Sequence, residues 1–229
     1  MNPVTDAALV AAGEAAGLDE TATVIDFGCG NATALTLFAG VFGASGTGIE
    51  ARPDACDTAR AMAAAAGCGD AIAIICTDAR EYRPPTPADL VVALGASHIW
   101  GGVPEAFAAL AATTGGTGLV LFGERYWKTT VVPPEFAREW PEIQSEYEIL
   151  AAARNEGYDL LWAWHAPVEE WDRYESGIWK NCLDWVRDHP DDSRTADILS
   201  YLRTIQEEYL AFGREHIGWG LYLLTPTVI

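Results

Sequence analysis

The feature that most constrains this chain is an apolar run that ends in two closely spaced glycines, the segment VIDFGCGNAT at positions 24–33. Its β-branched and aromatic residues are typical of a buried strand. Gly28 and Gly30 let the backbone turn sharply and approach a ligand closely, because they carry no Cβ. A helical run from Ala32 to Phe38 would then point its first N–H groups at that ligand. The segment therefore predicts a strand–turn–helix unit that holds a nucleoside-type cofactor.

The rest of the chain alternates apolar strand-like runs with helical runs. Further strands are predicted at 46–50, 71–76, 89–94, 118–122, 157–164 and 218–224, and helices at 7–17 (with Asp6 as N-cap), 53–66, 103–112, 135–155, 168–188 and 194–215. This alternation indicates a parallel sheet with helices on both faces. The 229 residues suit one well-filled domain. The predicted fold class is α/β, a Rossmann-like, doubly wound sheet.

Charge and cysteine content narrow the partners and the compartment. The chain has 33 acidic and 14 basic residues, a formal net charge of −19, and no Lys/Arg cluster. We therefore expect neither a nucleic acid nor an anionic membrane as a partner. No apolar run is long enough to span a bilayer, and no signal peptide is recognisable, so a cytoplasmic location is expected. The five cysteines form no CxxC pair or metal-ligand cluster, which predicts free thiols and no metal.

The glycine spacing distinguishes between nucleotide cofactors. Gly28-x-Gly30-x-x-Thr33 lacks the third glycine of the dinucleotide fingerprint GxGxxG. An acidic residue followed by Gly-Cys-Gly instead resembles motif I of the class I S-adenosylmethionine (SAM)-dependent methyltransferases. The resemblance extends over the strand pattern from Thr23 to Leu224. It departs at Ala32, where the family often has glycine.

The resemblance implies a set of cofactor contacts. Glu50, at the end of the second strand, would accept hydrogen bonds from both ribose hydroxyls. Asp78 and Ala79 would bind adenine, and Asp26 would lie near the methionine ammonium group. The full implied set is Asp26, Gly28, Cys29, Gly30, Asn31, Glu50, Ala51, Asp78, Ala79 and Gly95.

The resemblance also implies a particular domain plan. Residues 1–229 would form one domain around a seven-stranded sheet that is mostly parallel, with an antiparallel last strand. Residues 168–216 would form a helical insertion between the last two strands and cap the substrate side. The N-terminal helix, within residues 1–20, would act either as a lid over the cofactor or simply as cover for the sheet.

The acceptor side carries fewer sequence signals. His98 follows the fourth strand and is the candidate general base, since histidine exchanges protons near neutral pH, although it could also have no chemical role. Glu124 could hold a cationic or hydroxylated acceptor, or it could pair with Arg125 or face water. Further candidate substrate contacts are aromatic: Trp100, Trp127, Trp171 and Tyr174. The last two share a helical face with Glu175, a pattern that also suits core packing.

These features predict methyl transfer from SAM to a small organic acceptor, with S-adenosylhomocysteine (SAH) as the second product and no metal. Oxygen or nitrogen is the favoured methylated atom. The net charge favours a neutral or cationic acceptor, and the helical cap with its aromatic residues suggests that the acceptor has an apolar or aromatic part. One alternative is a SAM-binding protein with another activity, such as a cyclisation. The others are a non-enzymatic Rossmann-type binding module and a nicotinamide enzyme. The chain could be a monomer or a homodimer.

Overall fold

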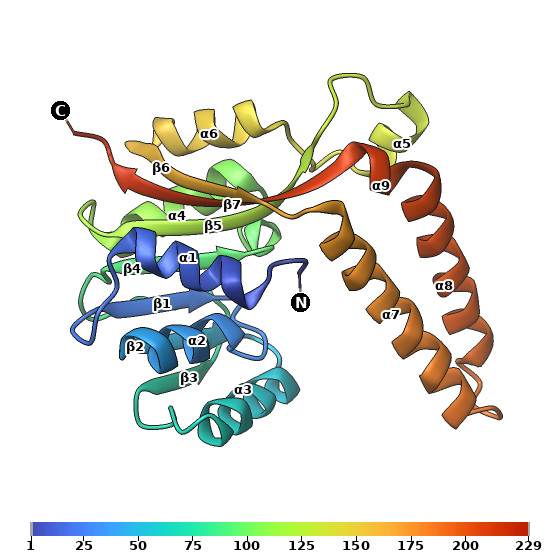
Figure 1. Ribbon diagram of the computed structural model, residues 1–229, viewed down its shortest axis with the longest axis horizontal. Helices are drawn as coiled ribbons and strands as arrows, with labels where there is room; N and C mark the ends of the chain where they lie inside the picture. Colours follow the sequence, from blue (N-terminus) through green and yellow to red (C-terminus); the bar gives the residue numbers. More distant parts are fainter. Residues whose placement is uncertain (1, 229) are drawn as a thin grey trace.

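A single seven-stranded sheet organises the computed structural model, which describes residues 2–228 (Figure 1). The strands lie in the order β3-β2-β1-β4-β5-β7-β6, and β7 is antiparallel to both of its neighbours while the other pairs are parallel. Their bounds are β1 Thr23–Phe27, β2 Ser45–Glu50, β3 Ile72–Cys76, β4 Leu90–Leu94, β5 Leu119–Trp127, β6 Tyr158–His165 and β7 Ile217–Pro226. The predicted fold class is confirmed. Residues 1 and 229 of the predicted domain lie outside the described residues.

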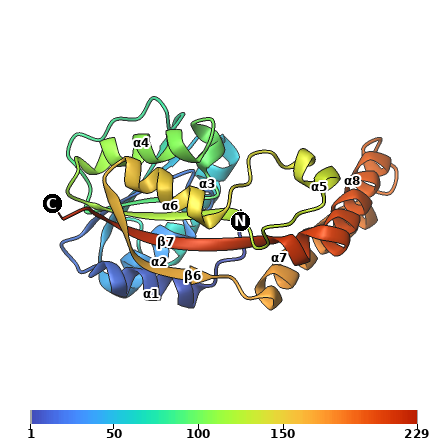
Figure 2. The same ribbon diagram turned by 90° about the horizontal axis from the view of Figure 1, so that it is seen from above.

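Helices cover both faces of the sheet, as the continuous apolar strands require (Figure 2). One face is covered by α1 (Asp6–Ala16), α2 (Thr33–Phe42) and α3 (Pro53–Ala65), and the other by α4 (Val103–Thr114) and α6 (Glu146–Asn155). The four residues at 90–93 of β4 are fully buried. Adjacent residues of a strand point to opposite faces, so this burial shows that β4 lies between two apolar layers.

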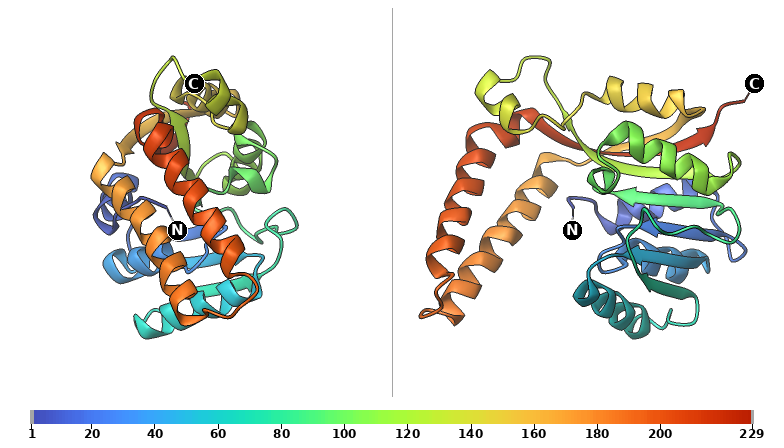
Figure 3. Two further views of the ribbon diagram at one scale, coloured as in Figure 1. Left: turned by 90° about the vertical axis from the view of Figure 1, so that its right-hand side faces the viewer. Right: turned by 180° about the vertical axis from the view of Figure 1, so that it is seen from behind.

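A helical hairpin is inserted between β6 and β7 and stands apart from the layered body (Figures 1 and 3). It consists of α7 (Val168–Asp188) and α8 (Thr195–Glu208) and returns to β7 through a π-helical turn, η2 (Tyr209–Gly213), and α9 (Arg214–His216). Its base packs in an aromatic cluster with α5 (Pro134–Glu139). There Asp172 accepts hydrogen bonds from Tyr209 Oη and Arg214 Nε, each at 2.8 Å. The predicted helical insertion is therefore present, at the carboxyl ends of the parallel strands.

One of the long predicted helices is wrong as a single helix. The run 135–155 forms α5 and α6 with a break between them, where Pro141 cannot donate a backbone hydrogen bond and Ser145 caps α6 in a reciprocal bond with Glu148. The run predicted at 194–215 is helical from Thr195 to His216, with a π-helical turn after Glu208. The break in the first run depends on single residues within an otherwise helical composition.

Two predicted element ends also need correction. Thr5, not Asp6, caps α1, because its side chain accepts from the N–H of Ala8. Strand β5 continues past Phe122 to Trp127, because β7 pairs with it along this whole length. Among residues 2–228 no helix is both long and apolar enough to cross a bilayer.

Candidate active site

A cavity of about 1270 Å³ is lined by residues at the carboxyl ends of the parallel strands and by residues of the α7–α8 hairpin. Pockets for a single small ligand usually measure roughly 300–1000 Å³, so this one has room for a nucleoside cofactor and a second small molecule. The predicted site residues that line it are Gly28, Gly30, Glu50, Ala51, Asp78, Ala79, Gly95, His98, Glu124, Trp171 and Tyr174. Pro3, just before α1, also lines it.

The glycine loop after β1 has an unusual backbone. Gly28, Gly30 and Ala32 all adopt left-handed conformations, with φ of 69°, 56° and 60°. The two glycines take this conformation freely, whereas at Ala32 it costs about 1–2 kcal/mol. A glycine at this position would avoid this strain. Because Ala32 has this left-handed conformation, α2 starts at Thr33, and the prediction of a helix from Ala32 is wrong.

Glu50, at the end of β2, faces this loop. Its Oε2 accepts from the N–H of Gly30 at 3.1 Å, and its Oε1 accepts from Arg52 N at 3.0 Å and Arg52 Nε at 3.1 Å. Burial alone would raise the pKa of Glu50, but these hydrogen bonds and the charge of Arg52 outweigh it and hold that pKa below its usual value. An ionised, nearly buried carboxylate therefore borders the cavity beside the glycine loop.

Asp78, after β3, repeats this arrangement. Its Oδ1 accepts from Arg80 N at 2.9 Å and Arg80 Nε at 3.0 Å, and its Oδ2 accepts from Arg80 Nη2 at 2.5 Å. These bonds lower the pKa of Asp78 to about 2. The chain thus has an acid–Ala–Arg segment at the ends of two neighbouring strands. In each segment the arginine forms an ion pair with the carboxylate that the resemblance assigns to nucleoside binding.

Asp26 lies in the middle of the sheet, 3% exposed, between β2 and β4. Burial, and to a smaller extent the negative charge of Glu50, raise the pKa of Asp26 to about 8. A cation beside this carboxyl group would compensate both effects. Asp26 does not line the cavity itself; it lies within β1, two residues before Gly28, which does.

On the acceptor side, β4 and β5 place a serine and a glutamate together. Ser97, in the short 3₁₀ turn η1 (Ser97–Ile99), donates to Glu124 Oε2 at 2.5 Å, and the N–H of Arg125 donates to Glu124 Oε1 at 3.0 Å. Glu124 is nevertheless part of the cavity wall, although it is largely buried. The exposed side chain of His98 projects from the same turn into this region of the lining.

Several predicted site residues lie elsewhere. The Asn31 side chain lies beside the start of α2, where its Oδ1 accepts from Thr33 Oγ1 at 2.8 Å, and Cys29 is buried against β2. Trp100 packs edge-on to Phe27, and Trp127 packs against Phe136 in the aromatic cluster, so neither lines the cavity. These two tryptophans were predicted as substrate contacts because they lie near strand ends. Where their side chains point depends on local backbone turns, which the sequence does not reveal.

The structure also brings in residues that the sequence analysis did not select. They come from η2, β5, β7, the hairpin and the segment around α5, and include Arg125, Trp140, Glu175, Tyr201, Glu208, Tyr209 and Trp219. Glu175 could have been found, because it follows Trp171 by four residues on the same face of α7. Trp219 could not, because its ring reaches across the sheet to the glycines at 95 and 123, and that proximity depends on the pairing of β5 with β7.

Within the described part of the chain, no group of three or more His, Cys, Asp or Glu side chains is arranged to hold a metal ion. The groups that border this site suit a nucleoside that carries a positively charged end. They are a glycine loop with room for close backbone approach, two ionised carboxylates at adjacent strand ends, and a buried acid that lacks a cation. These residues fit SAM.

Comparisons with known proteins identify the family and its cofactor. A family model described as a methyltransferase domain matches residues 24–117. A SAM-dependent methyltransferase from Thiobacillus denitrificans, solved in complex with SAH, is 30% identical, with 98% of this chain and 93% of that chain covered and a TM-score of 0.91. A second such complex, from Geobacter sulfurreducens, is also 30% identical, covers 98% of this chain and 92% of that one, and has a TM-score of 0.90. The uncharacterized protein YjhP of Escherichia coli (strain K12) is 28% identical over 97% of this chain and 92% of its own length.

Proposed function

This chain belongs to the class I SAM-dependent methyltransferases, and we propose that it transfers a methyl group to a small organic acceptor, at oxygen or nitrogen. The observation that carries the proposal is a single cavity bordered by the glycine loop, by Glu50 and by Asp78, with volume left over on the side of the hairpin. The two similar enzymes solved with SAH support the choice of cofactor.

The proposed cofactor contacts follow the ends of the strands. Glu50 would bind the ribose hydroxyls, Asp78 with Ala79 the adenine, and Asp26 with Gly95 the amino-acid end. SAM, when bound, supplies a methyl group on a sulfonium sulfur that a nucleophile can take by direct displacement. The chain's own task is to orient the acceptor and to exclude water.

The remaining cavity residues suit that task. His98 would accept a proton from the acceptor, because it is exposed to the cavity at the end of β4. Glu124 would orient the acceptor, since Ser97 and the Arg125 N–H fix both of its oxygens. Trp171 and Tyr174 would cover the acceptor from the hairpin, whose residues 168–216 we propose as the substrate cap.

The N-terminal segment has a proposed role as a lid. Pro3 lines the cavity, and Val4 packs against both the sheet cluster and the aromatic cluster at the base of the hairpin. Residues before α1 thus connect the two sides of the cavity.

The five cysteines are free thiols, which supports a reducing compartment such as the cytoplasm.

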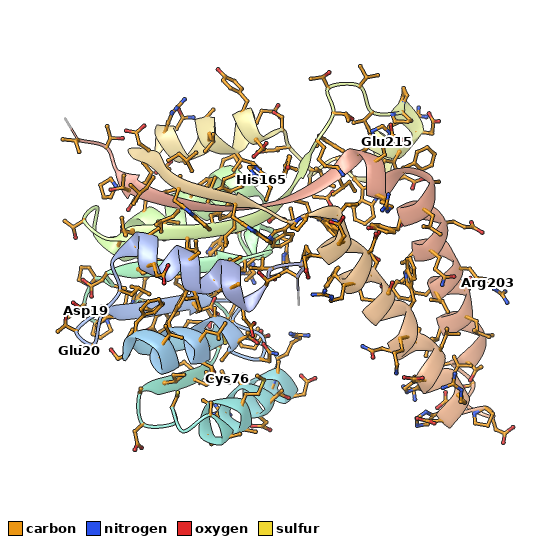
Figure 4. All side chains as sticks on the ribbon, viewed as in Figure 1. Asp19, Glu20, Cys76, His165, Arg203 and Glu215 are labelled. Atoms are coloured by element: carbon orange, nitrogen blue, oxygen red, sulfur yellow. The ribbon has the colours of Figure 1, made fainter. Side chains whose placement is uncertain are left out.

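The function is tested by titration calorimetry with SAM and SAH, followed by an assay for SAH release with a panel of small hydroxyl and amine compounds. Glu50→Gln should weaken binding of SAH by about tenfold or more, because it loses an ionised acceptor of two hydroxyl bonds. Glu20→Gln is the matched control, since Glu20 is exposed before β1, at the end of the molecule remote from the hairpin (Figure 4).

The outcomes separate the alternatives. Binding of SAM together with SAH release on addition of an acceptor supports methyl transfer. Binding without SAH release from any acceptor would favour a different reaction on the same cofactor. A folded protein that binds neither SAM nor SAH would contradict the proposal.

A further inference from the structure

We propose that the acceptor is a small primary or secondary amine with an apolar or aromatic group, bound as its ammonium ion between Glu175 of α7 and Glu208 of α8. This inference rests on the proposed methyl transfer and names the substrate class for the same cavity. The acceptor half of the cavity is the part lined by the hairpin, η2, α5 and the end of β5.

The charges of this half are strongly unbalanced. Four carboxylates line it: Glu124, Glu142, Glu175 and Glu208. The one arginine of the described lining here is Arg125, which is already occupied: its Nη2 donates to Glu142 at 3.1 Å and its guanidinium lies 4.8 Å from the centre of the Trp140 ring.

No other cation in the described chain compensates Glu175 and Glu208. Neither glutamate has a Lys or Arg side chain within ion-pair distance among residues 2–228. The arginines at 52 and 80 are held by their own carboxylates on the nucleoside side. Arg203, although on α8, points away from the sheet, as Figure 4 shows. A positively charged ligand group is therefore the partner that this half lacks.

The surroundings of these glutamates are aromatic. Trp171, 7% exposed, lies edge-on to Tyr174 at 5.8 Å between ring centres and 6.4 Å from Tyr209. Aromatic faces attract ammonium groups, most strongly where water is excluded. The rings also provide an apolar surface for the remainder of the amine.

An independent sign of a missing ligand is a buried donor with no acceptor. The indole N–H of Trp171 has no hydrogen-bond partner within the described residues, although more than nine-tenths of the side chain is buried. Trp219, in the same wall and 5% exposed, has the same deficit. Unpaired buried donors are costly, and an aromatic π-face in the ligand would supply a weak acceptor.

The ionisation of the two glutamates is consistent with an absent cation. Burial raises the pKa of Glu175 to about 7, with Glu208 adding to the rise and Arg125 of β5 opposing it. Burial also raises the pKa of Glu208, and Glu139 of α5 adds to it. Tyr174, on the same helix as Glu175, and Tyr209 of η2 are further titratable groups that face it. An ammonium ion between them would favour both charged forms.

The reaction balances with these groups. The ammonium loses one proton to His98, and the freed lone pair forms the new N–CH₃ bond while the C–S bond breaks and its electron pair stays on sulfur as SAH. The nitrogen becomes positive again as the bond forms, so Glu175 and Glu208 stabilise the charge that develops there. His98 returns its proton to water, to which it is exposed.

The test compares three probes that share a shape but differ in charge: phenethylamine, 2-phenylethanol and 3-phenylpropanoate. Each is titrated into the protein saturated with SAH, and each is assayed for SAH release with SAM. We expect phenethylamine to bind at least about tenfold more tightly than either analogue and to be the methylated probe. Glu175→Gln should remove most of this preference while SAH affinity changes by less than about twofold, which shows that the variant is folded.

Glu169→Gln is the matched control, because Glu169 is exposed in the first turn of α7 and is not part of the cavity wall. It should keep the preference for the amine. SAH binding with no preference for the amine, or with a preference for the alcohol or the acid, overturns this inference alone. A preference that survives Glu175→Gln and Glu208→Gln overturns the assignment of these residues. Failure of SAH itself to bind refutes the proposed function and this inference together.

Discussion

Replacing Asp26 by asparagine should stabilise the fold and weaken cofactor binding at the same time. The carboxyl group lies within the sheet, where burial and the nearby Glu50 raise its pKa to about 8 from an ordinary value of 3.8. Between these values the folded protein keeps a proton that the unfolded chain has released. Stability from this group is therefore complete below about pH 4, decreases as the pH rises, and levels off above about pH 8.

The expected magnitude follows from the distance between the two pKa values. Each pH unit between them costs about 1.4 kcal/mol, so at pH 7 the loss is of the order of 4 kcal/mol. Asparagine has nearly the same shape but cannot ionise. Asp26→Asn should thus be more stable than the parent at pH 7, by up to about 4 kcal/mol, and should match it near pH 4.

Urea denaturation followed by tryptophan fluorescence, at pH values of about 4, 6, 7 and 9, measures this difference. Calorimetry with SAH on the same samples should show weaker binding, because the methionine ammonium loses its counter-charge. Asp70→Asn, at an exposed position before β3, should leave both properties unchanged. If parent and Asp26→Asn have parallel stability profiles across this range, the carboxyl group is not held protonated by the fold and the reasoning is wrong.

Four further substitutions test the site and the fold. Arg80→Gln should raise SAH affinity by about two- to fivefold in calorimetry, because it frees Asp78 oxygens for adenine at the loss of only an exposed ion pair, and an unchanged or weaker affinity would contradict this. His98→Gln should lower the rate of SAH release by about tenfold or more with little change in SAH binding, whereas an unchanged rate removes His98 from the mechanism. In urea denaturation, Gly118→Ala should destabilise the protein by about 1–3 kcal/mol, since the new Cβ would overlap the Ala88 carbonyl oxygen. Gly40→Ala in α2, where the new Cβ meets open space, should stabilise the protein by up to about 1 kcal/mol.

The cofactor half of the cavity was predictable because its residues are local in sequence. Gly28, Gly30, Glu50 and Asp78 each lie at the end of a strand or within three residues after it, and neighbouring parallel strands bring their carboxyl ends to one edge. Apolar runs such as the one in β4 reveal the strands without any knowledge of their partners. The sequence did not reveal that Arg52 and Arg80 form ion pairs with Glu50 and Asp78. Side chains two residues apart pair only when the backbone turns at that point.

The acceptor half was less predictable because its walls come from distant segments. The spacing of Trp171 and Tyr174 indicates a shared helical face, and both do reach the cavity. Trp100 and Trp127 are also aromatic residues near strand ends, but they pack into the hydrophobic clusters and do not line the cavity. Trp171 and Tyr174 lie on a helix of the hairpin, where residues at this spacing share one face and so reach the cavity together. Residues just beyond a strand end have no such regular spacing, because each turn of the loop changes the direction of the side chains.

The net charge of −19 gains a more specific meaning from the structure. Ten of the fourteen Lys and Arg residues form ion pairs within the described chain, most of them on the surface. With 33 acidic residues, many carboxylates must remain without a cation, and water compensates those that are exposed. Glu175 and Glu208 are partly withdrawn from water beside aromatic rings, and the proposed ammonium ligand would supply the compensation there. Composition therefore predicts that unpaired acids exist, but only the cavity identifies the two with which the proposed amine would pair.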